Sequence, residues 1–132
     1  MKIKAGIINV TGYAGSELAR ILHNHQNIEI VQVTGRSQAG NHIAQAFPHL
    51  ADIDLQIEKS ITKKCDVIFS GLPHAASAEQ IKTYFNDKVK ILDLSADFRL
   101  NNLEEYTKWY DTEHPSPEKL QDFVYGLTEI YR

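Results

Sequence analysis

A glycine-containing motif near the start of the chain is the first stretch whose residue types could do chemistry. It reads N-V-T-G-Y-A-G over residues 9–15 and places Gly12 and Gly15 between an apolar run and a helical pattern. A backbone that must bend sharply and bring free N–H groups against a pyrophosphate cannot carry a Cβ at the contact. The helix that follows would add its unpaired N–H groups and its dipole. The motif therefore favours a bound dinucleotide, the alternative being a tight strand-to-helix turn without a ligand.

One position departs from the usual dinucleotide fingerprint, which carries three glycines. Asn9 stands where the first glycine would lie. Asparagine is the non-glycine residue that best tolerates a left-handed backbone, so the departure is chemically mild.

A second candidate segment lies about twenty residues after the glycine turn, where dinucleotide-binding domains select their cofactor. It reads T-G-R-S over residues 34–37 and offers Arg36 and Ser37 but no carboxylate. An acidic residue here would bind the ribose 2′-hydroxyl of NAD, whereas an arginine accommodates the 2′-phosphate of NADP. A guanidinium suits a phosphate dianion, which a carboxylate would repel. The segment therefore favours NADP, the alternative being an arginine on a solvated loop.

Few other side chains could act as nucleophile, acid or base. Cys65 is the only thiol and comes just before an expected strand, so it should lie at the amino end of the sheet as a structural cysteine. His74 follows a strand at the opposite edge, where a polar contact is more common than general-base catalysis. Asp97 and Arg99 could pair with each other or face a substrate anion. The remaining histidines lack ligand spacing, so we expect no metal site.

The elements that must position these residues alternate between strand and helix. Apolar runs predict strands and amphipathic spacing predicts helices. Such alternation argues for right-handed crossovers and a doubly wound α/β domain, with a mostly parallel sheet and helices on both faces. Strands are expected within residues 3–10, 28–33, 54–58, 65–74 and 90–94, with a strand or extended piece at 123–127. Helices are expected after Gly15, at 42–47, from a capping box at Ser77–Gln80, and from a cap at 102–105.

Ligands bind such a sheet at the carboxyl ends of its strands. Four segments should therefore meet at one edge: residues 9–15, 34–37, 71–74 and 95–99. This convergence supports a nucleotide site more strongly than any one motif does.

Composition limits the remaining possibilities. The chain has 132 residues, which predicts one domain over 1–132, and a net charge of −3, which gives no reason to expect nucleic acid. No apolar segment approaches the roughly 18 residues that span a bilayer. One cysteine excludes an internal disulfide. We therefore expect a cytoplasmic protein without nucleic-acid or membrane partners.

Several motifs together closely resemble the amino-terminal part of the N-acetyl-gamma-glutamyl-phosphate reductase family. The resemblance implies an aspartate-semialdehyde dehydrogenase type of fold. The most specific of them is D-L-S-A-D-F-R-L at 93–100. The others are T-G-Y-A-G-S-E-L at 11–18, G-R-S-x-A-G at 35–40, F-P-H-L at 47–50, L-P-H at 72–74, W-Y with E-H-P-x-P at 109–117, and V-Y-G-L-x-E at 124–129. The resemblance covers nearly the whole chain, with Asn9 and Thr128 as departures.

The resemblance implies cofactor roles for named residues. It implies that the pyrophosphate is held by residues 11–15, the 2′-phosphate by Arg36 and Ser37, and the nicotinamide side by residues 72–74, with Ser95 approaching cofactor or substrate. These cofactor residues are Thr11, Gly12, Tyr13, Ala14, Gly15, Arg36, Ser37, Leu72, Pro73, His74 and Ser95.

The resemblance also implies an activity that this stretch of chain does not complete. In that family a cysteine attacks an acyl phosphate, NADPH reduces the resulting thioester to an aldehyde, and a histidine handles the proton. Both groups lie beyond the equivalent of Arg132, so no catalytic residue is expected within 1–132, which alone should be inactive. The full-length protein is expected to be a homo-oligomer acting on a small acyl phosphate in arginine biosynthesis. The alternatives are a lysine-pathway aminoadipyl-phosphate reductase and a non-catalytic nucleotide-sensing module.

Overall fold

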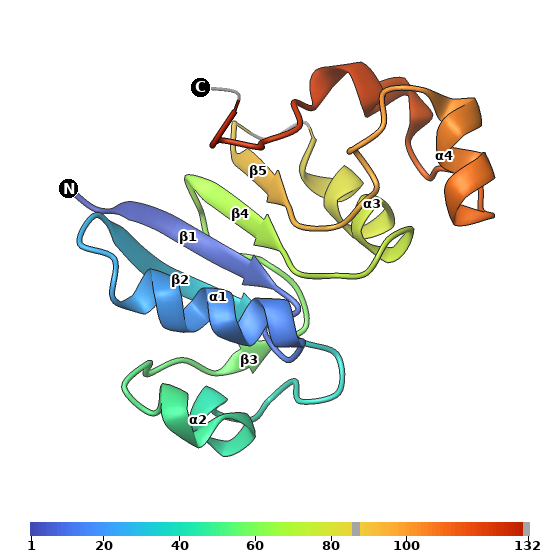
Figure 1. Cartoon of the computed structure of the whole chain (residues 1–132). Helices are drawn as coiled ribbons and strands as arrows, with labels where there is room; N and C mark the ends of the chain where they lie inside the picture. The colour runs from blue at the N-terminus through green and yellow to red at the C-terminus, as the bar shows by residue number, and fades with distance from the viewer. Residues whose placement is uncertain (86–87, 131–132) are drawn as a thin grey trace.

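One parallel sheet forms the centre of the computed structural model, which describes residues 1–85 and 88–130 (Figure 1). Within these residues the sheet has five strands in the order β3-β2-β1-β4-β5, and every neighbouring pair is parallel. The chain leaves β1 toward β2 on one side and later returns to β4 on the other. The doubly wound prediction is confirmed. The strands are β1 (Ile3–Ile8), β2 (Ile28–Thr34), β3 (Ile57–Glu58), β4 (Val67–Ser70) and β5 (Lys90–Asp93).

Helices cover both faces of this sheet. Side chains of α1 pack with α2 against one face, and α3 packs against the other together with the segment after β5. Figure 1 shows α1 crossing β1 and β2, with α2 beside β3 and α4 beyond α3. The helices are α1 (Tyr13–His23), α2 (Ile43–Ala46), α3 (Ala76–Ile81) and α4 (Leu103–Tyr110), with 3-10 turns η1 (Pro48–Leu50), η2 (Lys82–Tyr84) and η3 (Pro117–Asp122).

Strand alternation separates two apolar clusters. Successive strand side chains point to opposite faces, so the fully buried Ile7 belongs to one cluster and Ile8 to the other. The α1 side is the larger and includes Ala19 and Leu22 of α1. The α3 side includes Ala78 and Ile81. The clusters hold β1 and β4 rigidly between two helical layers, and these two strands carry the candidate site at their carboxyl ends.

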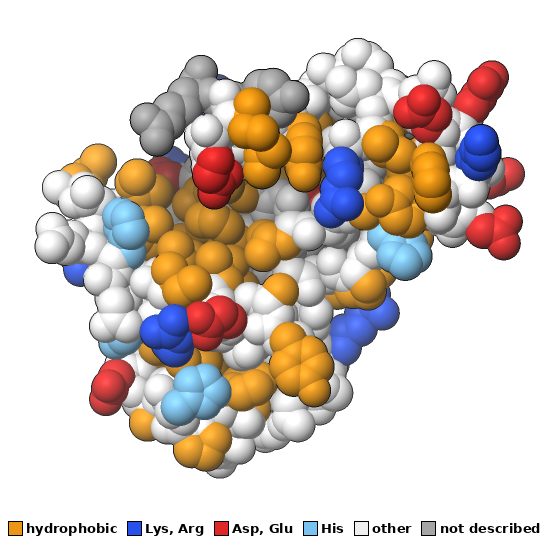
Figure 2. Space-filling view, viewed as in Figure 1, with side chains coloured by type: hydrophobic (Ala, Val, Ile, Leu, Met, Phe, Trp, Pro, Cys, Tyr) orange, Lys and Arg blue, Asp and Glu red, His pale blue; other side chains and the backbone are white. Residues whose placement is uncertain are grey.

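Part of the α1-side face remains open beside the edge strand β5. Leu92 and Leu94 are exposed there, together with Val124 and Tyr125 from the carboxyl-terminal segment. They line a groove of about 370 Å³ that reaches Phe69 of β4. Figure 2 shows hydrophobic side chains gathered in a hollow on this face of the molecule.

Three expectations need adjustment. The strand expected at 54–58 is limited to β3, and residues 123–127 form no strand although Phe123 is extended. Helix α3 begins at Ala76, so Ser77 is not its cap and the capping-box prediction is wrong. The physical reason is that a carboxylate from outside the helix takes that role, as described below. The cap predicted for α4 is confirmed, because the Asn102 side chain accepts the N–H of Glu104 at 2.8 Å.

Within the part of the chain that is described, no helix combines the length and the apolar character that crossing a bilayer requires.

Gly15→Ala tests how tightly β1 and α1 approach each other. A Cβ at Gly15 would overlap the carbonyl oxygen of Asn9 and lie 2.8 Å from the Cα of Val10, both of them backbone atoms that cannot rotate away. We expect the free energy of unfolding to fall by about 1 to 3 kcal/mol, the usual cost of overpacking. Urea denaturation measures it. Gly126→Ala is the control, since its Cβ would meet nothing within 4 Å. Equal stability of the two variants would contradict the close approach.

Candidate functional site

The carboxyl ends of β1 and β4 are tied together by Asn9. This residue has a φ of 62°, the left-handed conformation that asparagine tolerates best among non-glycine residues. Its side-chain Nδ2 donates to the carbonyl of Gly71 at 2.9 Å, and the N–H of Gly71 donates to the carbonyl of Ile8 at 3.0 Å. Asn9, the residue that departs from the glycine fingerprint, therefore keeps the turn and adds a hydrogen bond between the ends of the two strands.

Glycines let three backbone segments meet at this point. A Cβ on Gly71 would lie 3.2 Å from the nitrogen of Gly15, and a Cβ on Gly12 would lie 2.8 Å from Nδ2 of Asn9. Both distances are shorter than ordinary carbon contacts. Bare main chain is therefore what the turn presents, as a site that approaches a phosphate requires.

Three consecutive N–H groups at the start of α1 have no acceptor. The first intrahelical bond runs from Ser16 to the carbonyl of Gly12, and Gly12 contributes no side-chain cap. Among the described residues, nothing accepts the N–H groups of Tyr13, Ala14 or Gly15. The first turn contains no acidic residue, and Tyr13 and Ala14 are exposed, whereas Gly15 is buried. The turn is consequently electropositive and open to an anion.

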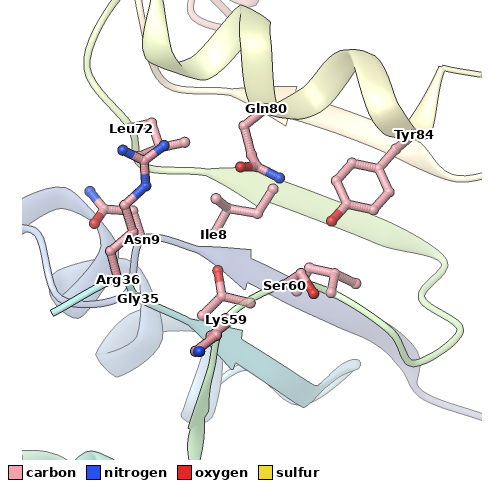
Figure 3. A pocket seen from close by; sticks show the side chains of 11 residues that line it. Ile8, Asn9, Gly35, Arg36, Lys59, Ser60, Leu72, Gln80 and Tyr84 are labelled. Atoms are coloured by element: carbon pink, nitrogen blue, oxygen red, sulfur yellow. The ribbon is translucent and has the colours of Figure 1, made fainter. Parts of the chain in front are cut away.

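A pocket beside this turn carries two cations. Arg36 follows β2 and Lys59 follows β3, and no carboxylate lines the pocket. Figure 3 shows Arg36 next to Asn9 and extending toward Leu72, with Gln80 and Tyr84 on the opposite side from Lys59 and Ser60. The lining residues are Ile8, Asn9, Thr34, Gly35, Arg36, Lys59, Ser60, Ile61, Leu72, Gln80 and Tyr84.

Lys59 is a pocket residue that sequence reasoning missed. The two-residue β3 gave only a weak strand pattern, so its carboxyl end was not counted among the converging segments. The pairing of Val33 with Ile57 brings this end beside β2. A lysine directly after a strand that neighbours β2 was the available signal.

The predicted site residues other than Gly12, Tyr13, Ala14 and Gly15, which are described above, divide into three groups. Arg36 and Leu72 line the pocket, and Thr11 packs against Gly35, where an added Cβ would lie 2.7 Å from its Cγ2. Pro73 and His74 follow β4 at the same edge and are exposed, whereas Ser37 is exposed outside the pocket lining. The third group is Ser95, which is engaged by neighbouring residues.

Ser95 belongs to a polar network at the ends of β4 and β5. Its hydroxyl donates to Asp93 at 2.8 Å and accepts the N–H of Asp97 at 3.1 Å. Ser77 donates to Asp93 at 2.7 Å, so the 2.7 Å contact between Ser77 and Ser70 must use the Ser70 proton. Ser70, Ser77 and Asp97 are fully buried. The network pins the two loops that flank the site.

Asp97 and Arg99 do not pair with each other in the described part of the chain. The carboxylate of Asp97 accepts the Ala75 and Ala78 N–H groups at 2.7 and 2.8 Å and the Tyr106 hydroxyl at 2.8 Å. Burial, followed by this hydrogen bond, raises the pKa of Tyr106. Arg99 is exposed, with its guanidinium carbon 5.9 Å from the centre of the Tyr125 ring.

Cys65 lies at the opposite edge of the sheet, before β4, as the sequence predicts. Its thiol contacts the carbonyl of Lys63 at 3.5 Å. Burial raises the pKa of Cys65, which keeps the thiol protonated and unreactive. Among the described residues no group of three histidine, cysteine or acidic side chains is arranged to hold a metal ion.

Known proteins share both the sequence and the architecture. The N-acetyl-gamma-glutamyl-phosphate reductase of Dehalococcoides mccartyi (strain ATCC BAA-2266) is 49% identical over 131 residues, covering 99% of this chain and 38% of that protein. A phosphate reductase of Nitrosopumilus maritimus, named for LysW-linked L-2-aminoadipate and L-glutamate, is 38% identical over 136 residues, covering 98% of this chain and 39% of that protein. The chain thus spans less than half the length of these relatives.

A solved structure and a family model agree with these likenesses. The crystal structure of aspartate semialdehyde dehydrogenase with NADP from Candida albicans superposes with a TM-score of 0.60 and 26% identity, covering 75% of this chain and 31% of that one. The model described as "Semialdehyde dehydrogenase, NAD binding domain" matches residues 4–132, nearly the full chain. The chain belongs to the semialdehyde dehydrogenase NAD-binding domain family.

Proposed function

We propose that residues 1–132 form the domain that binds NADP(H) in an acyl-phosphate reductase. The observation that carries the proposal is the anion site at the start of α1, where three free N–H groups lie beside a turn that has no room for a Cβ at Gly12 or Gly15. The family to which the chain belongs is named for binding a nicotinamide dinucleotide. Residues 131–132 of this proposed domain lie outside the described part of the structure.

The residues present fit such a cofactor at each part of its length. The main chain of Thr11–Gly15 would hold the pyrophosphate by N–H donation. The pocket with Arg36 and Lys59 would hold the 2′-phosphate at the adenosine end, and Pro73 and His74 would face the nicotinamide. Leu72, predicted for the nicotinamide side, lines the pocket with Arg36. Ser37 and Ser95 stay predictions as cofactor contacts, because Ser37 lies outside the pocket lining and the Ser95 hydroxyl is already bonded.

Selection of NADP over NAD is supported by charge. Arg36 and Lys59 have no ion-pair partner among the described residues, and no carboxylate lines their pocket to repel a 2′-phosphate. The solved relative from Candida albicans contains NADP. Two unpaired cations beside the ribose position are what a phosphomonoester dianion needs.

The reaction proposed for the longer protein is reduction of N-acetylglutamyl 5-phosphate to the 5-semialdehyde, the activity for which the Dehalococcoides relative is named. NADPH supplies the hydride to the acyl carbon. This chain's own residues would bind and orient the cofactor, with main-chain amides at the pyrophosphate and the loop after β4 at the nicotinamide. Residues 1–132 provide no thiol at that edge, because Cys65 is the only cysteine of the sequence and precedes β4 at the other edge. Homo-oligomer formation and cytoplasmic location stay predictions.

A second candidate substrate is an aminoadipyl phosphate attached to a carrier protein. It is favoured by the likeness to the Nitrosopumilus phosphate reductase, at 38% identity. The cofactor site would serve both reactions without change. A nucleotide-sensing module without chemistry is the remaining alternative, and the activity of the longer polypeptide separates it from the two enzymes.

Cofactor selection can be tested by titrating NADPH and NADH against Arg36→Ala. Losing one charge-assisted phosphate contact should weaken NADPH binding by about 1.5 to 3 kcal/mol. The lower end is expected because Arg36 is exposed to solvent. NADH affinity should stay the same, since NADH lacks the phosphate. Lys59→Ala should act in the same direction with a smaller effect, and isothermal titration calorimetry measures both.

Arg20→Ala is the matched control, because it removes an exposed arginine paired with Glu17 at 2.6 Å, away from the pocket. It should leave both affinities unchanged. Equal NADPH and NADH affinities in the unmodified chain, unaltered in Arg36→Ala, would contradict the 2′-phosphate assignment.

Residues 1–132 alone should show no turnover. With N-acetylglutamate 5-semialdehyde, phosphate and NADP, absorbance at the NADPH wavelength should not rise, because no activated thiol faces the cofactor edge. Binding of NADPH by the same preparation serves as the control for folding. Phosphate-dependent turnover, lost in Cys65→Ser, would contradict the structural role given to Cys65.

A further inference from the structure

The loop that follows β4 contains a strained turn directly after His74. Ala75 has φ 61° and ψ −47°, and the N–H of Ala76 donates to the carbonyl of His74 at 2.8 Å. This is a γ-turn with positive φ, a rare conformation that a residue with a Cβ adopts only when its surroundings enforce it. The turn fixes the backbone of His74 in the loop after β4, at the edge of the sheet where ligands bind.

Asp97 is the group that enforces this turn. One carboxylate oxygen accepts the N–H of Ala75 and the other accepts the N–H of Ala78. Ala75 is the residue before α3, and Ala78 is the third residue of the helix. A capping box satisfies the N–H groups at these same two positions with two side chains. A single carboxylate from the loop after β5 therefore fixes both the turn and the start of α3.

Asp97 is itself fixed from behind. It is fully buried, and the Tyr106 hydroxyl donates to the oxygen that also holds Ala75. Its backbone carbonyl accepts a hydrogen bond from Nε2 of His114 at 2.8 Å. Nε2 is the donor because Nδ1 of that ring accepts the N–H of Ser116 and so carries no proton. No buried side-chain polar atom in the described chain lacks a partner. The carboxylate cannot move without breaking several bonds.

Aromatic contacts connect His74 back to Asp97 through α4. The His74 and Tyr110 rings have centroids 5.4 Å apart, and Tyr110 lies 4.9 Å from Tyr106. Tyr106 returns to Asp97 through its hydroxyl. His74 is thus held through its backbone by Asp97 and through its ring by α4.

We infer that Asp97 is a positioning residue for the nicotinamide half of the cofactor, acting through the His74–Ala76 turn. This inference rests on the proposed function. The adenosine half binds elsewhere, at the pocket with Arg36 and Lys59, and none of the pocket residues bonds to Asp97. The two halves of the cofactor should therefore respond differently when Asp97 changes.

Asp97→Asn tests this, with NADPH and 2′,5′-ADP as the two probes in calorimetric titrations. The amide keeps the shape but turns one acceptor into a donor, which would face one of the N–H groups. NADPH affinity should fall about tenfold or more, as expected for an unsatisfied buried donor. The affinity for 2′,5′-ADP, which lacks the nicotinamide half, should stay within about twofold. Asp52→Asn, an exposed aspartate after η1, is the control and should change neither.

Two further variants separate positioning from folding. Ala75→Gly removes the Cβ penalty at φ 61° and should restore part of the NADPH affinity in the Asp97→Asn background, which a role limited to α3 stability would not produce. Tyr106→Phe removes one of the three donors to the carboxylate and should show a smaller loss confined to NADPH.

The outcomes distinguish this inference from the proposed function. If Tyr106→Phe and Asp97→Asn weaken the binding of NADPH and of 2′,5′-ADP equally, or if both variants bind NADPH as the unmodified chain does, the role given to Asp97 is overturned. The proposed function would stand in either case. An unmodified chain that binds neither NADPH nor 2′,5′-ADP would overturn the proposed function and this inference with it.

Discussion

The close approach of bare main chain between β1, α1 and β4 is the constraint on which the rest of the structure depends. Gly15 and Gly71 leave no room for a Cβ between them, and Asn9 ties the two strand ends together. This contact exists only because β1 and β4 are adjacent at the point where the strand order reverses. The two apolar clusters stabilise the strands from either face, so the amides at the start of α1 are held open without support from their own side chains.

Polar groups at the carboxyl edge of the sheet fall into two classes with opposite roles. The network from Ser70 to Asp97 is buried or partly buried, and every buried side-chain polar atom in the described chain has a partner, which fixes backbone geometry. The first N–H groups of α1 and the cations of Arg36 and Lys59 lack partners within the described chain, and Tyr13, Ala14 and both cations are exposed. The fixed class sets where the loops lie, and the open class offers hydrogen-bond donors and positive charge to an anion. Both classes fit the NAD-binding domain family to which the chain belongs.

The sequence predicted the fold and most of the edge because hydrophobic periodicity and glycine turns are local properties. The strand pattern, the convergence of four loops and the position of Cys65 followed from it. Three features did not. Lys59 was missed because β3 is only two residues long, the capping box at Ser77 was wrong because Asp97 caps α3 from a distance, and the role of Asp97 was left open. Each depends on contacts between residues far apart in the chain, which no local pattern encodes.

Asn9 combines two requirements that the glycine fingerprint normally keeps apart. Its backbone needs the positive φ that glycine adopts freely, and its amide must also reach the carbonyl of Gly71. Glycine would meet only the first requirement, and aspartate would set an acceptor against that carbonyl and a negative charge beside an anion site. A glycine at position 9 would therefore keep the turn but leave the ends of β1 and β4 without the side-chain bond that joins them.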